Sequence, residues 1–259
     1  MKASVSQIKA FKACRRSWYL KWHEKLEPVQ IPDSLQTGRS YHAYLEMLEK
    51  GEDLPEDFNK ACAMAWAFQK YILPQIKVVS AEKELEKQIG CHVLHGFLDG
   101  IADDGCIVEH KTTSRDISEG GEYEYNLQWD EQILAYMSLT GSRKVYYTVV
   151  KKPNIRLKKG ETDEEFFRRM IEWYDVETDQ KIRVFTVERT DEEVQQFEND
   201  FVEICNEIEN AKNLYRNCQH CSSFGRRCEY SSICLHYDPS QNYVEFVKKE
   251  DEKDELDED

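Results

Sequence analysis

Apolar residues recur at helical spacing at both ends of the chain and alternate with polar residues in its middle. The helical spacing predicts helices over residues 4–22, 33–50, 56–72, 129–139, 162–174 and 191–215. Ser4 or Ser6 can cap the first helix, and Asp191 can cap the last. The alternation predicts strands over residues 78–89, 92–102, 106–112, 144–151 and 182–187. This order of elements predicts an α/β (α+β) fold with a central mixed sheet flanked by helices.

The second and third predicted strands form a hairpin, and its register places three charged residues. The loop 103–105, with the sequence DDG, is typical of a three-residue turn that ends in a left-handed glycine. In that register Asp99 faces Glu109, and Lys111 shares the face of Glu109. A two-residue loop would instead put the two carboxylates on opposite faces. The expected chemistry therefore depends on the length of the turn.

Two facing carboxylates in an apolar hairpin repel each other and lose hydration, and a divalent cation removes both costs. Oxygen ligands with open water positions suit Mg²⁺ or Mn²⁺, and the carbonyl of His110 would point near such an ion. Lys111 adds an ammonium that can orient or deprotonate water, or stabilise charge that develops on phosphorus. The alternative is an ordinary surface Glu–Lys pair.

The apolar context favours the first interpretation, because both faces of the hairpin look covered. We expect Phe97, Ile101 and Ile107 on one face, and Leu98, Ala102 and Val108 on the other.

Several motifs around the hairpin resemble the RecB-like branch of the PD-(D/E)xK nuclease superfamily. They are Gly96-Phe-Leu-Asp99, Glu109-His-Lys111, Gln132-x3-Tyr136 and the upstream Gly38-x3-His42. The resemblance covers nearly the whole chain except its tail, and it implies a restriction-endonuclease-like core. It also implies that His42 joins Asp99, Glu109 and His110 at the metal, and that Gln132 and Tyr136 contact DNA or brace the catalytic strand. The acidic residue that the family often has on its first core strand matches Glu82, with Glu84 as the competing assignment.

Nine cysteines, an odd number, argue against a closed set of disulfides. Four of them are scattered and are expected to be buried: Cys62, Cys91, Cys106 and Cys205. Cys221, Cys228 and Cys234 lie in one short segment, and either Cys218 or the remote Cys14 could complete a set of four thiolates. Spacing alone leaves zinc and a [4Fe–4S] cluster open.

The segments CRRSW, from Cys14, and CSSFGRRCEYSSIC, from Cys221, resemble a subset of RecB-like nucleases that hold an iron–sulfur cluster. That subset includes phage single-domain exonucleases and CRISPR-adaptation nucleases. The resemblance implies a [4Fe–4S] cluster on Cys14, Cys221, Cys228 and Cys234 that ties the N-terminal helices to the C-terminal segment. Arg15 replaces the usual proline and Cys218 is surplus, so the fourth ligand stays open.

The net charge of −15 opposes nucleic-acid binding, but the last fifteen residues, 245–259, carry −6 of it. DNA binding would therefore depend on local basic segments. The candidates are Arg15, Arg16, Lys151, Lys152 and Arg156. No stretch is apolar enough to span a membrane and no secretory signal is present, so we expect a soluble cytoplasmic protein, made by a phage in its host.

These features divide the chain into a helical region (1–77), a nuclease core (78–190), a C-terminal helix with the cysteine segment (191–240) and an acidic disordered tail (241–259). The expected function is metal-dependent hydrolysis of DNA, as an exonuclease on single strands or ends in phage recombination, replication or repair. A recombination or replication protein is the expected partner, and the oligomeric state stays open. The alternatives are an iron–sulfur module that binds DNA ends without cutting, and an acidic DNA mimic.

Overall fold

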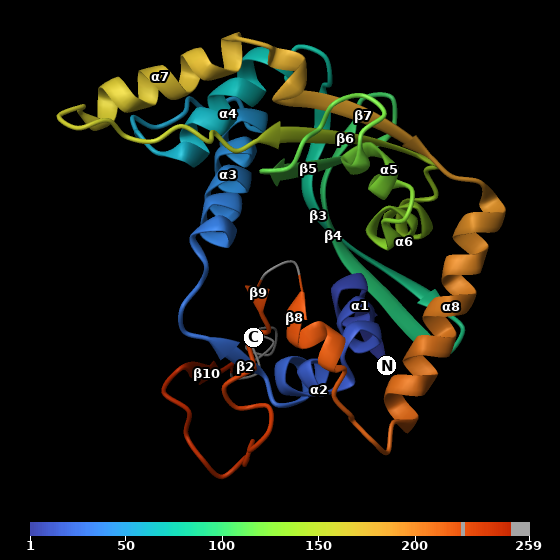
Figure 1. The fold of residues 1–259 in the computed structure, drawn as a ribbon. Coiled ribbons are helices and arrows are strands. Elements are labelled where there is room, and N and C mark those ends of the chain that lie inside the picture. The colour runs from blue at the N-terminus through green and yellow to red at the C-terminus, as the bar shows by residue number, and fades with distance from the viewer. Residues whose placement is uncertain (224–225, 250–259) are drawn as a thin grey trace, which may run out of the picture.

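The computed structural model describes residues 1–223 and 226–249, except the side chains of residues 81, 82, 223 and 226 (Figure 1). A six-stranded sheet forms its centre, in the order β1-β4-β5-β6-β7 with β3 also on β4. The strands are β1 (Lys2–Ser4), β3 (Val78–Ile89), β4 (His92–Ala102), β5 (Ile107–Thr113), β6 (Lys144–Lys151) and β7 (Ile182–Glu188). The pairs β1–β4 and β5–β6 are parallel and the others antiparallel. The predicted central mixed sheet is confirmed.

One edge of β4 is left partly unpaired. Strand β3 pairs with β4 from its first residue to its last, so β1 and β5 must share the opposite edge. Strand β1 reaches only as far as His95, and β5 pairs only with Gly100 and Ile101. Residues 96–99 therefore have no strand partner on that edge in the described part of the chain. This gap lies next to Asp99, between the part of the edge that pairs with β1 and the part that pairs with β5.

Helices cover both faces of the sheet. One face packs against α3 (Asp33–Glu49), α4 (Lys60–Tyr71) and α7 (Asp163–Asp175), with Tyr41, Phe68 and Tyr174 almost fully buried there. The other face packs against α5 (Glu122–Leu127) and α6 (Glu131–Thr140). Helices α1 (Val5–Ala13) and α8 (Asp191–Asn210) extend this second layer over β4 (Figure 1).

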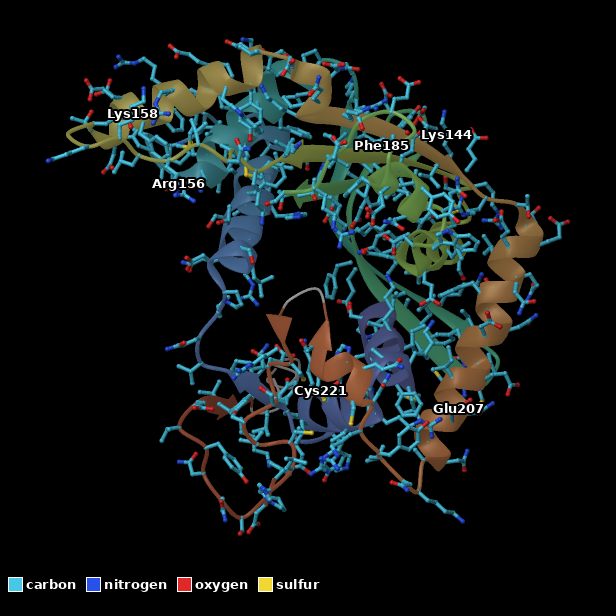
Figure 2. All side chains as sticks on the ribbon, viewed as in Figure 1. Lys144, Arg156, Lys158, Phe185, Glu207 and Cys221 are labelled. Carbon is cyan, nitrogen blue, oxygen red and sulfur yellow. The ribbon has the colours of Figure 1, made fainter. Side chains whose placement is uncertain are left out.

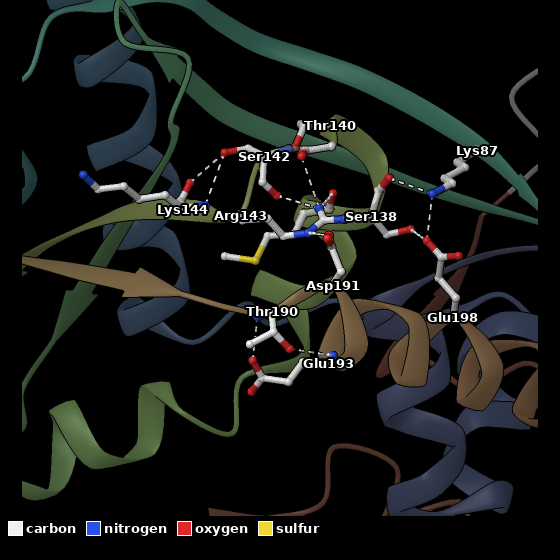
Figure 3. A network of polar contacts seen from close by, with 12 residues as sticks. Lys87, Ser138, Thr140, Ser142, Arg143, Lys144, Thr190, Asp191, Glu193 and Glu198 are labelled. Carbon is white, nitrogen blue, oxygen red and sulfur yellow. Dashed lines mark hydrogen bonds and ion pairs between the residues drawn. The ribbon is translucent and has the colours of Figure 1, made fainter.

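A polar network joins α6 to α8 and so fixes the helix that carries Gln132 and Tyr136 (Figure 3). The carboxylate of Glu198 accepts hydrogen bonds from Lys87 Nζ at 2.7 Å and from Ser138 Oγ at 2.6 Å. Beyond the end of α6, Arg143 Nε donates to Asp191 at 2.6 Å. The Glu198 carboxylate thereby links α6 and β3 to α8.

The two ends of the chain meet below the sheet (Figure 1). Strand β2 (Leu26–Pro28) pairs with β10 (Phe246–Lys248), and the hydroxyl of Tyr230 donates to Leu26 O at 2.8 Å. The remaining short elements here are α2 (Arg15–Trp18), the π-helix η1 (Tyr19–His23), the 3₁₀ turn η3 (Cys218–Cys221), β8 (Ser222–Ser223) and β9 (Arg226–Arg227); a further turn, η2 (Thr178–Gln180), precedes β7.

Several predicted boundaries need correction. The first helix is interrupted at Cys14, whose φ of −162° and ψ of 109° are extended, so the predicted helix 4–22 is three short pieces. The predicted disordered tail begins too early, because Phe246 is buried and belongs to β10; residues 250–259 lie outside the described part.

Two predictions of burial are also wrong. Cys91 is exposed, whereas Cys62, Cys106 and Cys205 are buried as expected. Phe97 is 61% exposed, and Leu98 belongs to the same apolar cluster as Ile107, whereas Ala102 and Val108 belong to the cluster on the other face of the sheet. Among the described helices, none is both long and apolar enough to cross a bilayer.

Candidate active site

The hairpin between β4 and β5 adopts the register that places the charged residues together. Gly105 has a φ of +81°, and Ala102 N donates to Cys106 O at 2.8 Å across the three-residue loop. The paired residues are Gly100 with Val108 and Ile101 with Ile107, as expected. Beyond them the strands separate, and the carboxylate of Asp99 accepts the backbone N–H of His110 at 2.7 Å. Asp99 is thereby held at the point where the two strands diverge.

Glu109 and Lys111 lie side by side on β5. Glu109 is 1% exposed, and its Oε1 accepts a hydrogen bond from Lys111 Nζ. Its second oxygen, Oε2, is buried without a hydrogen-bond partner among the described residues. A buried carboxylate oxygen with no partner is costly, so this atom marks a place where a ligand is needed.

Helix α6 supports the ammonium of Lys111. Lys111 Nζ also donates to Gln132 Oε1 at 3.2 Å, and Gln132 Nε2 donates to the hydroxyl of Tyr136 at 2.6 Å. Gln132 and Tyr136 are four residues apart and so share one face of the helix. This chain of hydrogen bonds links Gln132 and Tyr136 of α6 to Lys111 of β5.

Helix α3 brings His42 to Asp99 from the other side. Its Nδ1 lies 3.4 Å from Asp99 Oδ1. The imidazole of His110 points elsewhere, with Nδ1 2.7 Å from Thr148 Oγ1 and Nε2 3.0 Å from Glu49 Oε1. The ring of His110 is therefore hydrogen-bonded within the core, and its backbone N–H is the group that donates to Asp99.

The charges of this group are unequal. Burial tends to raise the pKa of Asp99, but His42 and the His110 backbone outweigh it and hold this pKa at about 2. Burial raises the pKa of Glu109 to about 7, against the opposing effect of Lys111 and with a further increase from Asp99. The pKa of His42 is raised, because the carboxylate of Asp99 outweighs the effect of burial. The site thus carries one ionised carboxylate and a second that holds a proton near neutral pH.

An open cavity of about 910 Å³ borders His42. Its other walls come mainly from α3 and the end of β5, and their charged residues are Arg39, Arg115 and Lys152, against one carboxylate, Glu46. A cationic cavity beside paired carboxylates suits a polyanion whose backbone approaches a metal.

A family model described as the PD-(D/E)XK nuclease superfamily matches residues 2–71 and 58–235. The chain belongs to this superfamily. Nucleases of the PD-(D/E)XK superfamily generally use Mg²⁺ or Mn²⁺, and their substrate class suggests DNA. No curated protein matches the chain.

Several solved structures of exonucleases align with this chain. An inferred exonuclease from Eubacterium rectale aligns with a TM-score of 0.51 at 13% identity, over 93% of this chain and 90% of that one. The alkaline exonuclease of Laribacter hongkongensis aligns with a TM-score of 0.34 at 14% identity, over 80% of this chain and 95% of that one. A phage-related exonuclease from Haemophilus somnus 129PT aligns with a TM-score of 0.36 at 15% identity, over 75% of this chain and 92% of that one. Of these three, the Eubacterium rectale structure supports a shared fold.

The donors of this PD-(D/E)XK nuclease suit a hard divalent cation. Asp99 and Glu109 supply oxygen atoms, one of them without a partner, and His42 adjoins Asp99. Within residues 1–223 and 226–249, no three His, Cys, Asp or Glu side chains are already arranged as a metal site. Lys111 Nζ donates to Glu109 Oε1, so a cation at this oxygen would compete with the ammonium. The side chain of Glu82 lies outside the described residues.

The basic residues expected to bind DNA are in different situations. Lys152 lines the large cavity, and its Nζ donates to Ser34 O at 2.8 Å. Arg15 donates to Glu207 at 2.6 Å and lies over the rings of Phe11 and Tyr215, so its contacts are internal. Arg156 is exposed on the loop beside α7, away from the hairpin (Figure 2).

The two remaining candidates are Arg16 and Lys151. The guanidinium of Arg16 lies over the rings of Tyr19 and Tyr237, and Lys151 ends β6 beside the large cavity's Lys152. Sequence reasoning missed Arg39 and Arg115. Arg39 lies inside the Gly38-x3-His42 motif, and Arg115 follows the end of β5. Their positions next to these motifs could have indicated that they lie near the site.

The four candidate cluster cysteines gather where the chain ends meet. Cys14 is buried, and its Sγ accepts the backbone N–H of Asn217 at 3.4 Å. Burial raises the pKa of the Cys228 and Cys234 thiols, and the neighbouring Cys14 and Cys221 raise both further. Cys218 lies exposed at the start of η3. Protein contacts also join the N-terminal helices to the C-terminal segment here, since Asn217 Nδ2 donates to Ala13 O at 2.9 Å.

Proposed function

We propose that this nuclease is a divalent-metal-dependent deoxyribonuclease that acts as an exonuclease on single-stranded DNA or DNA ends. The observation that carries the proposal is the unpartnered, buried Oε2 of Glu109, which lies in the same group as the ionised carboxylate of Asp99. A bound Mg²⁺ or Mn²⁺ would provide the missing partner. The resemblance of the motifs to phage exonucleases supports a role in phage recombination, replication or repair.

His42, Asp99, Glu109 and the carbonyl of His110 would hold the metal, which when bound supplies Lewis acidity and a water of lowered pKa. Lys111 orients the attacking water or stabilises the charge that develops on the phosphate oxygens. Gln132 keeps the ammonium in place, because its side-chain oxygen accepts from Lys111 Nζ. The cationic side chains of Arg39, Arg115 and Lys152 bind the phosphates that flank the scissile bond.

Cleavage of end-labelled DNA in Mg²⁺ or Mn²⁺ tests the proposal. We expect Lys111→Ala and Asp99→Ala to lose at least about 100-fold in rate while still binding DNA. Lys158→Ala, on the exposed loop beside α7, is the control and should cleave normally (Figure 2). Full activity in both site variants would reject the assignment. Resistance of circular single strands would establish exonuclease action, and binding without cleavage by the unmodified protein would favour the end-binding module.

We further propose that Cys14, Cys221, Cys228 and Cys234 hold a [4Fe–4S] cluster whose role is structural. The gathering of these four thiols from both chain ends supports it. The cluster would close a loop of almost the whole chain, which restricts the unfolded state. Protein purified without oxygen should be brown, with about four iron atoms per chain. A colourless protein with one zinc ion per chain would show that these cysteines bind zinc and not an iron–sulfur cluster.

A further inference from the structure

A second, smaller cavity opens at the unpaired edge of β4. It has a volume of about 320 Å³ and lies between the start of α1, residues 95–97 of β4, and α6. The strand gap at residues 96–99 leaves this edge free, since β1 ends opposite His95. The volume is at the lower end of the ~300–1,000 Å³ range of small-ligand sites, which suits one unpaired nucleotide and excludes a duplex.

The cavity is linked to the proposed catalytic group through Gln132. Gln132 and Tyr136 form part of its wall, and Gln132 also binds the ammonium of Lys111. Phe97, another wall residue, stands two positions before Asp99 on the same strand. The large cavity beside His42 lies on the α3 side, so the two carboxylates are flanked by cavities on both sides. A strand that crosses the carboxylates would leave one base at Phe97.

The wall residues have the chemistry that an unpaired base requires. Phe97 offers an aromatic face that is 61% exposed although its neighbour Leu98 is buried. Nδ1 of His95 is buried without a partner among the described residues, and burial lowers the pKa of His95, so the ring is neutral at neutral pH. Lys9, paired with Asp130 at 2.7 Å, adds a cation at the rim for a phosphate.

Gly96 keeps the cavity open. A Cβ at this position would lie 3.2 Å from Leu139 Cδ1 and 3.4 Å from Tyr136 Cε1. Any side chain here would therefore displace α6 residues that form the wall. The close approach of β4 to α6 is possible because residue 96 has no side chain.

We propose that this cavity is a base-binding subsite, in which the base of one unpaired nucleotide of single-stranded DNA stacks on Phe97 beside the scissile bond. The inference rests on the proposed deoxyribonuclease function and names how that site selects single strands. Stacking on an aromatic side chain tolerates all four bases, because every base has a π-face. The subsite thus selects for an unpaired nucleotide rather than for a sequence.

A double-mutant cycle between Phe97 and the DNA tests the subsite. Affinity for a labelled single strand is measured by fluorescence anisotropy in chelator, so that no cleavage occurs, and an abasic nucleotide is moved through the strand one position at a time. We expect Phe97→Ala to weaken binding about 5- to 150-fold. At one position, the abasic nucleotide should weaken binding to the unmodified protein but not to Phe97→Ala.

Two variants control the cycle. Phe97→Trp should retain the coupling, because it keeps an aromatic face. Phe58→Ala removes another exposed phenylalanine, which packs against Phe167 away from this cavity, and should behave as the unmodified protein. Additive losses at every abasic position would overturn the subsite. If the protein cleaves DNA but the losses of affinity are additive, the subsite alone is rejected. If Phe97 and the abasic position are coupled but the protein does not cleave DNA in Mg²⁺ or Mn²⁺, the proposed hydrolysis is rejected and the subsite is retained.

Discussion

The buried carboxyl of Glu109 should make the metal-free protein less stable as pH rises. Its pKa is raised from 4.5 to about 7, chiefly by burial. As pH increases from 4.5 towards 7, the unfolded chain releases this proton before the folded protein does, so the free energy of unfolding decreases. The contribution of this residue to stability is greatest below pH 4.5 and is lost by the time the pH exceeds 7.

Glu109→Gln removes this charge at nearly constant volume. Each pKa unit corresponds to about 1.4 kcal/mol, so at about pH 8 the variant should be more stable than the unmodified protein by about 3 kcal/mol. At about pH 5 the carboxyl is protonated in the folded protein, and the difference should fall below about 1 kcal/mol. The variant should nevertheless lose cleavage, since an amide is a poor substitute for a carboxylate ligand.

Urea denaturation in chelator at both pH values measures these differences. Glu164→Gln is the control, because its side chain is 61% exposed and its removal should change stability little at either pH. Addition of Mn²⁺ should reduce or reverse the difference in the free energy of unfolding at pH 8, because the ion stabilises only the protein that binds it. The reasoning would be refuted if Glu109→Gln were no more stable than the unmodified protein at pH 8. It would also be refuted if the variant gained the same free energy of unfolding at both pH values.

Three further results are expected. His42→Ala should weaken Mn²⁺ binding in calorimetry by at least about tenfold, since it removes a candidate ligand beside Asp99. Arg15→Ala should lower the free energy of unfolding by about 1 kcal/mol without changing DNA affinity, because its contacts are internal. Gly100→Ala, whose Cβ would lie 2.8 Å from a Val78 methyl, should destabilise by about 1–3 kcal/mol in urea, whereas Gly38→Ala meets nothing within 4 Å and should be neutral or stabilising.

Much of the hairpin could be predicted from the sequence. The DDG loop and the alternation on either side of it specify the register, because turn type and side-chain period are local properties. The predicted limits of β3 and β4 agree with the structure, and so do the start of α3 and the strand 144–151. For the same reason, the grouping of Glu109 with Lys111 and of Gln132 with Tyr136 needed no tertiary information.

Tertiary structure alone decided how these local pieces meet. The approach of His42 to Asp99 joins α3 to a strand more than fifty residues away, and no periodicity encodes it. The gap in the edge of β4 depends on where β1 stops, and β1 is a three-residue strand with no alternation to reveal it. The exposure of Phe97 was likewise decided by tertiary structure, because alternation places its side chain on a face without showing whether a helix covers it.

The same distinction explains the two ends of the chain. The sequence indicated that Cys14 belongs with the distant cysteines only through a resemblance, whereas the structure shows the contacts that bring it to Asn217. It also shows that the first helix breaks at Cys14, because this backbone turns away to meet the C-terminal segment. The pattern of apolar residues shows which face of a helix or strand is buried. Only the tertiary structure determines which other element packs against that face.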